Sequence, residues 1–372
     1  MIARRFQRGA TPLPLGIATF VLLSLVADAS AVAQDVDDQW TVTPEEIEAA
    51  RSAPLFQSDD VLELTLYADF NTIKRRDRGE DPEERPALLH FDEDGSEATI
   101  ALKIQTRGLW RRDRRNCDLP PLWLDLDKDD EAIVGTVFEG QNRLKLYVTC
   151  RPGRDDYERY IYTEYVIYPA YNVLTDLSFR ARPARVTYVD TSGEDDTFTS
   201  NAYILEHKSQ LAARNEAVPI DLERLHPGRG SQEDAAIMEL FNYAVGMTDY
   251  SISGLHNVEP IRRMDGTLIP VSYDFDWSGT VNARYAVPAP SLPIRNVRER
   301  VFQGVCRNID YGPIFQRFTD KREEMISVVE NFDALEEDLR DRVIEYWEDF
   351  FEMAADEGTH RRILRDCTPM PN

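Results

Sequence analysis

Four oxygen-bearing side chains in one stretch of the chain have the types and spacing needed to hold a divalent cation beside a reacting hydroxyl group. Asp249 follows a segment of helical character, and Asn257 comes eight residues later. Asp274 and Asp276 stand at the end of a short apolar run. Phosphoryl transfer requires a carboxylate that orients the attacking hydroxyl and hard oxygen ligands that hold magnesium against the phosphates. These residues therefore predict a site for metal-dependent phosphoryl transfer.

Cationic residues earlier in the chain could bind the phosphates. Lys145 lies in an expected strand and Glu164 follows 19 residues later in an expected helix, which is the order of the phosphate-binding lysine and its glutamate partner in protein kinases. Lys103, on an earlier strand, is the alternative for this lysine. A basic turn predicts a further phosphate contact, with a solvated loop that balances nearby acidic residues as the alternative. The turn consists of Arg107-Gly108 followed by Arg111, Arg112, Arg114 and Arg115.

The elements that must position these residues form a β-rich part followed by a mostly helical part. Helical spacing of apolar and aromatic residues predicts a helix over residues 155–172, kinked or frayed near Pro169, and further helices over residues 232–245 and 319–357. A charged loop is expected over residues 71–85. This order favours an α+β protein with two lobes and a cleft between them. Strands are predicted at residues 61–68, 86–91, 98–106, 122–126, 143–149, 184–189, 201–207 and 271–276.

The first 33 residues have the features of a removable export signal. Arginines precede an apolar stretch over about residues 13–26, and small residues that end in Ala31-Val32-Ala33 follow it, so we expect cleavage before Gln34. The apolar stretch has roughly 14 residues, whereas spanning a bilayer takes about 20, and a retained membrane anchor is the alternative. We therefore expect an exported protein, periplasmic or extracellular, with no stable membrane anchor after the signal is cleaved.

Four cysteines follow the signal, and an exported chain meets an oxidising environment in which they can pair. We predict that Cys117 pairs with Cys150 and that Cys306 pairs with Cys367, because each pair encloses a contiguous block of sequence. A structural zinc site is the disfavoured alternative, because the chain has no CxxC or His-x-x-x-His spacing.

The formal net charge of −24 at pH 7 bounds the partners of the chain. Such acidity repels nucleic acid and anionic membranes, so we expect no nucleic-acid partner. An acidic protein that handles a polyphosphate must use local basic residues and metal ions.

Several short motifs follow one another in an order that is hard to obtain by chance. They are the Arg107-Gly108 turn, the strand Ala202-Tyr203-Ile204-Leu205-Glu206, the step Thr248-Asp249 with His256-Asn257, and Tyr273-Asp274-Phe275-Asp276. Together they resemble the CotH family of exported atypical protein kinases, first known as spore-coat proteins. The resemblance extends over roughly residues 95–350.

The resemblance implies a divergent, bilobal protein-kinase-like fold of the α+β class. Its β-rich N-terminal lobe would comprise residues 61–207 and contain one helix, and its helical C-terminal lobe would comprise residues 208–372 and carry the metal site. Ahead of the lobes we expect the signal peptide, residues 1–33, and an acidic arm, residues 34–60, with a short helix capped by Thr43. The implied activity is transfer of the γ-phosphate of ATP to Ser or Thr of exported proteins, with Mg²⁺ or Mn²⁺ as the cation.

At the positions that match the family, the resemblance also implies roles for individual residues. Asp249 would be the catalytic carboxylate, and Asn257 a ligand on the metal side. Asp274 would be the metal-binding aspartate, with Asp276 as a second candidate. The residues expected to bind the nucleotide are Lys145, Glu164, Arg107 and Glu206.

The chain also departs from the usual kinase pattern. It has no Gly-x-Gly-x-x-Gly loop, no His-Arg-Asp triplet and no Ala-Pro-Glu segment, and Asp276 stands where typical kinases have glycine. These departures leave open a catalytically inactive nucleotide-binding or envelope assembly protein on the same scaffold. A third alternative is a metal-assisted or carboxylate-based hydrolase that uses Asp249, Asp274 and Asp276.

Overall fold

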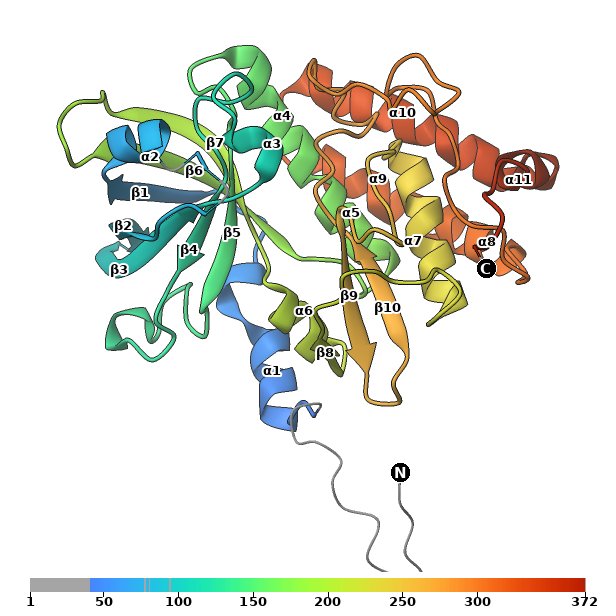
Figure 1. The fold of residues 1–372 in the computed structure, drawn as a ribbon, viewed down its shortest axis with the longest axis horizontal. Coiled ribbons are helices and arrows are strands. Elements are labelled where there is room, and N and C mark those ends of the chain that lie inside the picture. Colours follow the sequence, from blue (N-terminus) through green and yellow to red (C-terminus); the bar gives the residue numbers. More distant parts are fainter. Residues whose placement is uncertain (1–40, 77, 80, 94, 372) are drawn as a thin grey trace, which may run out of the picture. The chain divides into compact units, whose positions relative to one another are not determined.

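A closed barrel of seven strands dominates the first half of the part of the chain that the computed structural model describes, residues 41–76, 78–79, 81–93 and 95–371 (Figure 1). The strand order around the barrel is β1-β2-β3-β4-β5-β7-β6. Neighbouring strands are antiparallel, except that β1 and β6 pair in parallel and close the barrel. The barrel strands are β1 (Leu62–Ala68), β2 (Arg85–Glu93), β3 (Ser96–Thr106), β4 (Leu122–Asp125), β5 (Arg143–Val148), β6 (Ala181–Asp190) and β7 (Phe198–Leu205).

Two consecutive helices, α4 (Asp155–Tyr165) and α5 (Ile167–Leu174), connect β5 to β6. The sequence predicts one helix here, but Pro169 lies in the first turn of α5, and a proline in the middle of a helix loses a hydrogen bond and clashes with the carbonyl of the residue four positions before it. The helix therefore stops at Tyr165 and a new one starts after Val166. Figure 1 shows α4 and α5 between the barrel and the C-terminal helices.

A second, smaller sheet follows the barrel. Its strands β8 (Ala217–Pro219), β9 (Val258–Arg263) and β10 (Leu268–Ser272) are antiparallel in the order β10-β9-β8. The predicted helix over residues 232–245 is confirmed as α7 (Gln232–Val245), whose N-terminus is capped by the Ser231 hydroxyl. The remaining helical segments are α1 (Pro44–Ser52), η2 (Pro54–Phe56), α2 (Phe70–Arg76), α3 (Leu109–Arg112), η3 (Glu131–Ile133), α6 (Lys208–Arg214), α8 (Gly312–Asp320), α9 (Arg322–Glu330), α10 (Glu337–Ala355) and α11 (Glu357–Leu364).

The prediction of a divergent, bilobal protein-kinase-like fold with a β-rich N-terminal lobe and a mostly helical C-terminal lobe is wrong. The structure has a closed, mixed seven-stranded barrel, and the second half contains a sheet as well as helices. Apolar periodicity located the barrel strands, but it carries no information on which strands pair. The barrel is closed by the pairing of residues far apart in the chain, such as Leu62 with Ala184. The predicted signal peptide, residues 1–33, lies outside the described residues.

Strand β5 is buried on both faces and so joins the two hydrophobic cores. Leu144, Leu146 and Val148 point into the core inside the barrel. Lys145 and Tyr147 alternate with them and point to the opposite face, where Tyr147 belongs to the core around α5, α7 and β10. The register of β5 therefore places a lysine between two apolar layers.

Both predicted disulfides are confirmed. Cys117 is bonded to Cys150 and Cys306 to Cys367, with Cα atoms 4.7 and 5.0 Å apart. Two disulfides fit a protein of an oxidising compartment outside the cytoplasm. Among the described residues, the helices are all too short or too polar to cross a bilayer.

Glu206 joins three separate segments through a buried ion cluster. Its fully buried carboxylate accepts hydrogen bonds from the guanidinium groups of Arg180 and Arg214, at donor–acceptor distances of 2.8 to 3.3 Å. Arg180 also donates to the backbone oxygens of Ala50 and Arg51 in α1. The cluster therefore links α1, the segment that enters β6, and α6, which carries Arg214.

We expect Glu206→Gln to lower the free energy of unfolding by about 3 kcal/mol, because it leaves the buried Arg214 and the half-buried Arg180 without their carboxylate. Denaturant unfolding of the disulfide-intact protein measures the change. The control is Glu216→Gln, whose side chain is 65% exposed in its pair with Arg51 and should cost less than about 1 kcal/mol. Equal losses in the two variants would show that the cluster does not stabilise the fold.

Candidate metal centre

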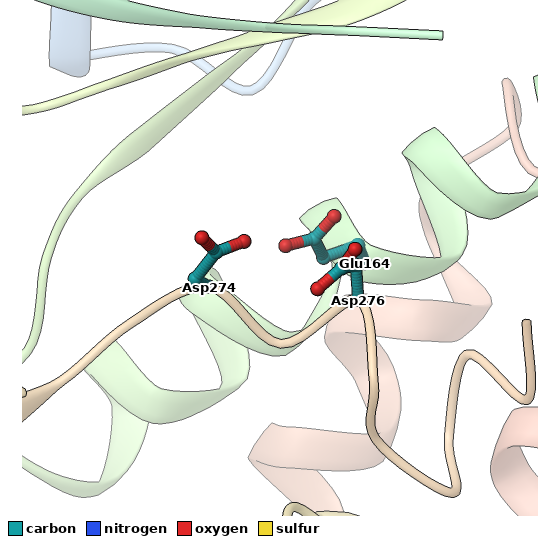
Figure 2. A group of neighbouring side chains, drawn as sticks. All are labelled: Glu164, Asp274 and Asp276. Atoms are coloured by element: carbon teal, nitrogen blue, oxygen red, sulfur yellow. The ribbon is translucent and has the colours of Figure 1, made fainter. Parts of the chain in front are cut away.

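Three carboxylates from two distant segments converge on one point. Glu164 comes from α4, and Asp274 and Asp276 come from the segment that follows β10. One oxygen from each side chain lies within 4.8 Å of the others, and Figure 2 shows the three carboxylates turned toward one another. The fold thus brings together three of the residues that the sequence singled out, although Glu164 lies 110 positions before Asp274 in the chain.

Phe275 fixes the two aspartates and the glutamate relative to one another. Its fully buried ring contacts Tyr168 and Phe241, with ring centres 5.2 and 5.9 Å away. Its backbone N–H donates to Glu164 Oε1 at 3.0 Å. The backbone N–H of Asp274 donates to the Tyr168 hydroxyl, also at 3.0 Å. The apolar residue between the two aspartates therefore anchors the turn that presents them.

Asp274 and Asn257 both have left-handed backbone conformations, with φ angles of 62° and 51°. Asp and Asn enter this region more readily than other residues with a side chain, but it still costs free energy. The two positions are joined because the Asn257 carbonyl accepts from the backbone N–H of Tyr273 at 3.1 Å. Such conformations persist where the surroundings require them, and they are frequent at functional sites.

The electrostatics of the three carboxylates favour a bound cation. Burial, followed by the charges of Asp276 and Asp274, raises the pKa of Glu164 well above its usual value. Burial also raises the pKa of Asp276 to about 6, although Arg111 opposes this change. Ionised carboxylates at this separation repel one another at low dielectric. A cation bound among them would remove this cost, and three hard oxygen donors are the ligands that Mg²⁺, Mn²⁺ and Ca²⁺ prefer.

Arg111, in α3, is paired with one member of this group. Its Nη2 lies 2.5 Å from Asp276 Oδ2, and the Tyr285 hydroxyl donates to the same oxygen at 3.2 Å. The other arginines of the basic turn are placed differently. Arg115 is paired with Asp113 at the surface, and Arg112 donates to the Gly108 carbonyl. The sequence predicts that this basic turn contacts phosphate as one unit. In the structure, Arg111 is instead paired with Asp276 of the three carboxylates.

Lys145 and Arg107 form a cationic side of the site. The Lys145 side chain is only 4% exposed, and its Nζ lies 3.5 Å from Glu259 Oε1. Burial, followed by the charge of Arg107, lowers its pKa to about 8, while Glu259 and Asp274 oppose the shift. Both cations are therefore within electrostatic reach of Asp274. Burial opposes the shift, but Tyr147 and then Asp274 raise the pKa of Arg107.

Lys145 has a different partner from the one the sequence predicts. Its ion pair is with Glu259 on β9, because α4 turns Glu164 toward the aspartates that follow β10. Glu259 was missed since a single charged residue in a short strand gives no signal in the sequence. Lys103, the alternative lysine, has a side chain that is 65% exposed and is paired with Glu84.

Asp249 and Asn257 form a neighbouring polar group with His256. Asp249 Oδ1 lies 3.0 Å from His256 Nε2, and the Asn257 amide donates to the backbone oxygen of Asp249 at 2.8 Å and to Oδ2 at 3.3 Å. The hydrogen bond to Asp249 raises the pKa of His256, and Asp274 adds to this shift. The Asp249 side chain is 38% exposed, so a large substrate can reach it.

Glu206, which the resemblance assigns to nucleotide binding, is fully buried and held by Arg180 and Arg214 as described above. Its carboxylate is thus occupied by protein donors. Comparison of the sequence with models of known protein families and with curated proteins finds no match. The function therefore has to be inferred from the chemistry of these residues and from the motif resemblance.

We expect Lys145→Met to stabilise the protein by about 2 kcal/mol at pH 7, because it removes a buried ammonium group with an unfavourable environment. The pKa of Lys145 is about 8 in the folded protein and ordinarily 10.5. Between these values the unfolded chain binds more protons, so the stability of the wild type rises with pH and the advantage of the variant shrinks.

Melting temperatures measured between pH 7 and 10 test this expectation, with the exposed Lys103→Met as the control. An advantage of Lys145→Met that does not change over this range would contradict the lowered pKa.

Proposed function

We propose that this chain is an exported, metal-dependent phosphotransferase that moves the γ-phosphate of ATP to a Ser or Thr hydroxyl of an exported protein, as its resemblance to the CotH family implies. The observation that carries the proposal is the group of three carboxylates, of which Glu164 and Asp276 are buried and Asp274 is half-buried, beside the buried side chains of Lys145 and Arg111. This combination suits a ligand that has a divalent cation on one side and phosphate oxygens on the other.

The charges of the site support a ligand that binds only together with a metal. The triad and Glu259 carry four negative charges when ionised, and Lys145, Arg107 and Arg111 carry three positive ones, so the sum is −4 + 3 = −1. A divalent cation changes this sum to −1 + 2 = +1. The site would therefore repel a polyphosphate without the metal and attract it with the metal.

Each group of residues has a distinct task in this proposal. Glu164, Asp274 and Asp276 hold the cation, which when bound screens the negative charge of the phosphates. Lys145 and Arg107 attract the phosphate oxygens, and the burial of Lys145 strengthens its attraction.

Asp249 would orient the hydroxyl of the acceptor and accept its proton. The carboxylate is exposed enough to be reached, and its bonds to His256 and Asn257 fix its direction. Disulfides and the predicted export signal support action outside the cytoplasm, in the periplasm or the medium.

Two substitutions should separate binding from transfer. We expect Asp274→Asn, which tolerates the left-handed backbone, to weaken the binding of Mn²⁺ at least about tenfold and to abolish Mn²⁺-dependent binding of ATP. We expect Asp249→Asn to bind ATP and Mn²⁺ like the wild type but to lose transfer by about a hundredfold or more. Melting-curve titrations and transfer of labelled phosphate to envelope proteins measure the two effects.

The control is Asp265→Asn, an exposed turn residue between β9 and β10 that should change neither property. If neither Mn²⁺ nor ATP shifts the melting curve of the wild-type protein, the proposal is wrong. Binding of ATP without transfer to any envelope protein would instead support the inactive nucleotide-binding alternative.

A further inference from the structure

Arg111 carries a buried nitrogen that lacks a hydrogen-bond partner. Its side chain is 9% exposed, and Nη2 is taken up by Asp276. Within the described chain, Nη1 is shielded from solvent and has no partner. An unsatisfied buried donor on a charged group costs free energy unless a ligand supplies an acceptor.

The loop around Arg111 is held in place from several sides. The disulfide between Cys117 and Cys150 fastens the loop to the end of β5. The Arg78 guanidinium donates to the carbonyl of Cys117 at 3.0 Å and to that of Arg112 at 3.3 Å. These contacts fix the guanidinium of Arg111 beside Asp276, so its unpartnered nitrogen belongs to a built arrangement.

Arg111 also changes the charge seen by a cation among the three carboxylates. Burial disfavours its charge, but Asp276, Asp274 and Glu164 all favour it, so Arg111 remains cationic. When all three carboxylates are ionised, the charge of the triad with Arg111 is −3 + 1 = −2, which one divalent cation balances. Without Arg111 the charge would be −3, and a cation alone would bind more tightly.

We propose that Arg111 couples metal binding to polyphosphate binding. It weakens the binding of the cation alone by neutralising part of the triad, and its Nη1 donates to a phosphate oxygen when the nucleotide arrives with the metal. This role rests on the proposed function, and it deepens that function by naming the residue that makes the two ligands bind together. A residue that only supported the structure would lower the affinity for both ligands when removed.

Titration calorimetry with the disulfide-intact full chain tests the coupling in Arg111→Gln. Mn²⁺ alone should bind about fivefold to tenfold more tightly than to the wild type, and ATP in saturating Mn²⁺ should bind about tenfold more weakly. The opposite signs of the two changes are the result to look for. The matched control is Arg115→Gln, an exposed arginine of the same loop that should change neither affinity.

Arg111→Lys provides a second test, and it decides the question if Arg111→Gln fails to fold. It keeps the charge, so the affinity for Mn²⁺ alone should stay within about twofold of the wild type, but it lacks the paired donors, so ATP should bind several-fold more weakly. Weaker or unchanged binding of Mn²⁺ to Arg111→Gln, or unchanged binding of ATP to Arg111→Lys, would overturn the coupling role while leaving the proposed function intact. A wild type that binds neither ligand would overturn both.

Discussion

The structure depends on the cost of gathering three carboxylates, two buried and one half-buried, at one point. Glu164, Asp274 and Asp276 have oxygens within 4.8 Å of one another, and burial raises the pKa of both Glu164 and Asp276. Carboxylates in such a setting must be protonated, paired or bound to a cation. The protein supplies one partner, Arg111, and anchors the turn by the ring and backbone of Phe275. The chain thus holds the arrangement together, and a divalent cation would complete its charge balance.

The barrel matters to the site mainly through β5. Because this strand is covered on both faces, Lys145 is desolvated and its pKa falls to about 8. A buried lysine destabilises the fold unless an anion lies close to it. The nearest carboxylate oxygen of its partner, Glu259 Oε1, is 3.5 Å from Lys145 Nζ, which is a long contact for an ion pair. The protein itself thus supplies too few opposite charges for the three carboxylates and for Lys145. A metal–polyphosphate ligand would satisfy both at once, whereas a neutral sugar or a simple phosphoester would satisfy less of the site.

Local features of the sequence predicted much of the local structure, although most of α2 lies in the expected charged loop over residues 71–85, and the strands β8 and β9 were not predicted. The barrel strands, the helix α7 and both disulfides agree with expectation, because periodicity, capping and enclosed cysteine pairs are short-range signals. The closure of the barrel by β1 and β6 could not be read from such signals, and this is why the fold class was wrong. The acidic pair Asp274 and Asp276 was recognisable from its place at a strand end. Three features depend on tertiary packing and could not be predicted. Glu164 lies beside the two aspartates, and Lys145 pairs with Glu259 instead of Glu164. Arg111 pairs with Asp276.

The most direct test is a crystal structure of the disulfide-intact protein with Mn²⁺ and a non-hydrolysable ATP analogue, in which anomalous scattering locates the manganese. Our assignment predicts one manganese bound by oxygens of Glu164, Asp274 and Asp276, with phosphate oxygens facing Lys145 and Arg107. Manganese found elsewhere, or an analogue bound away from these carboxylates, would contradict it.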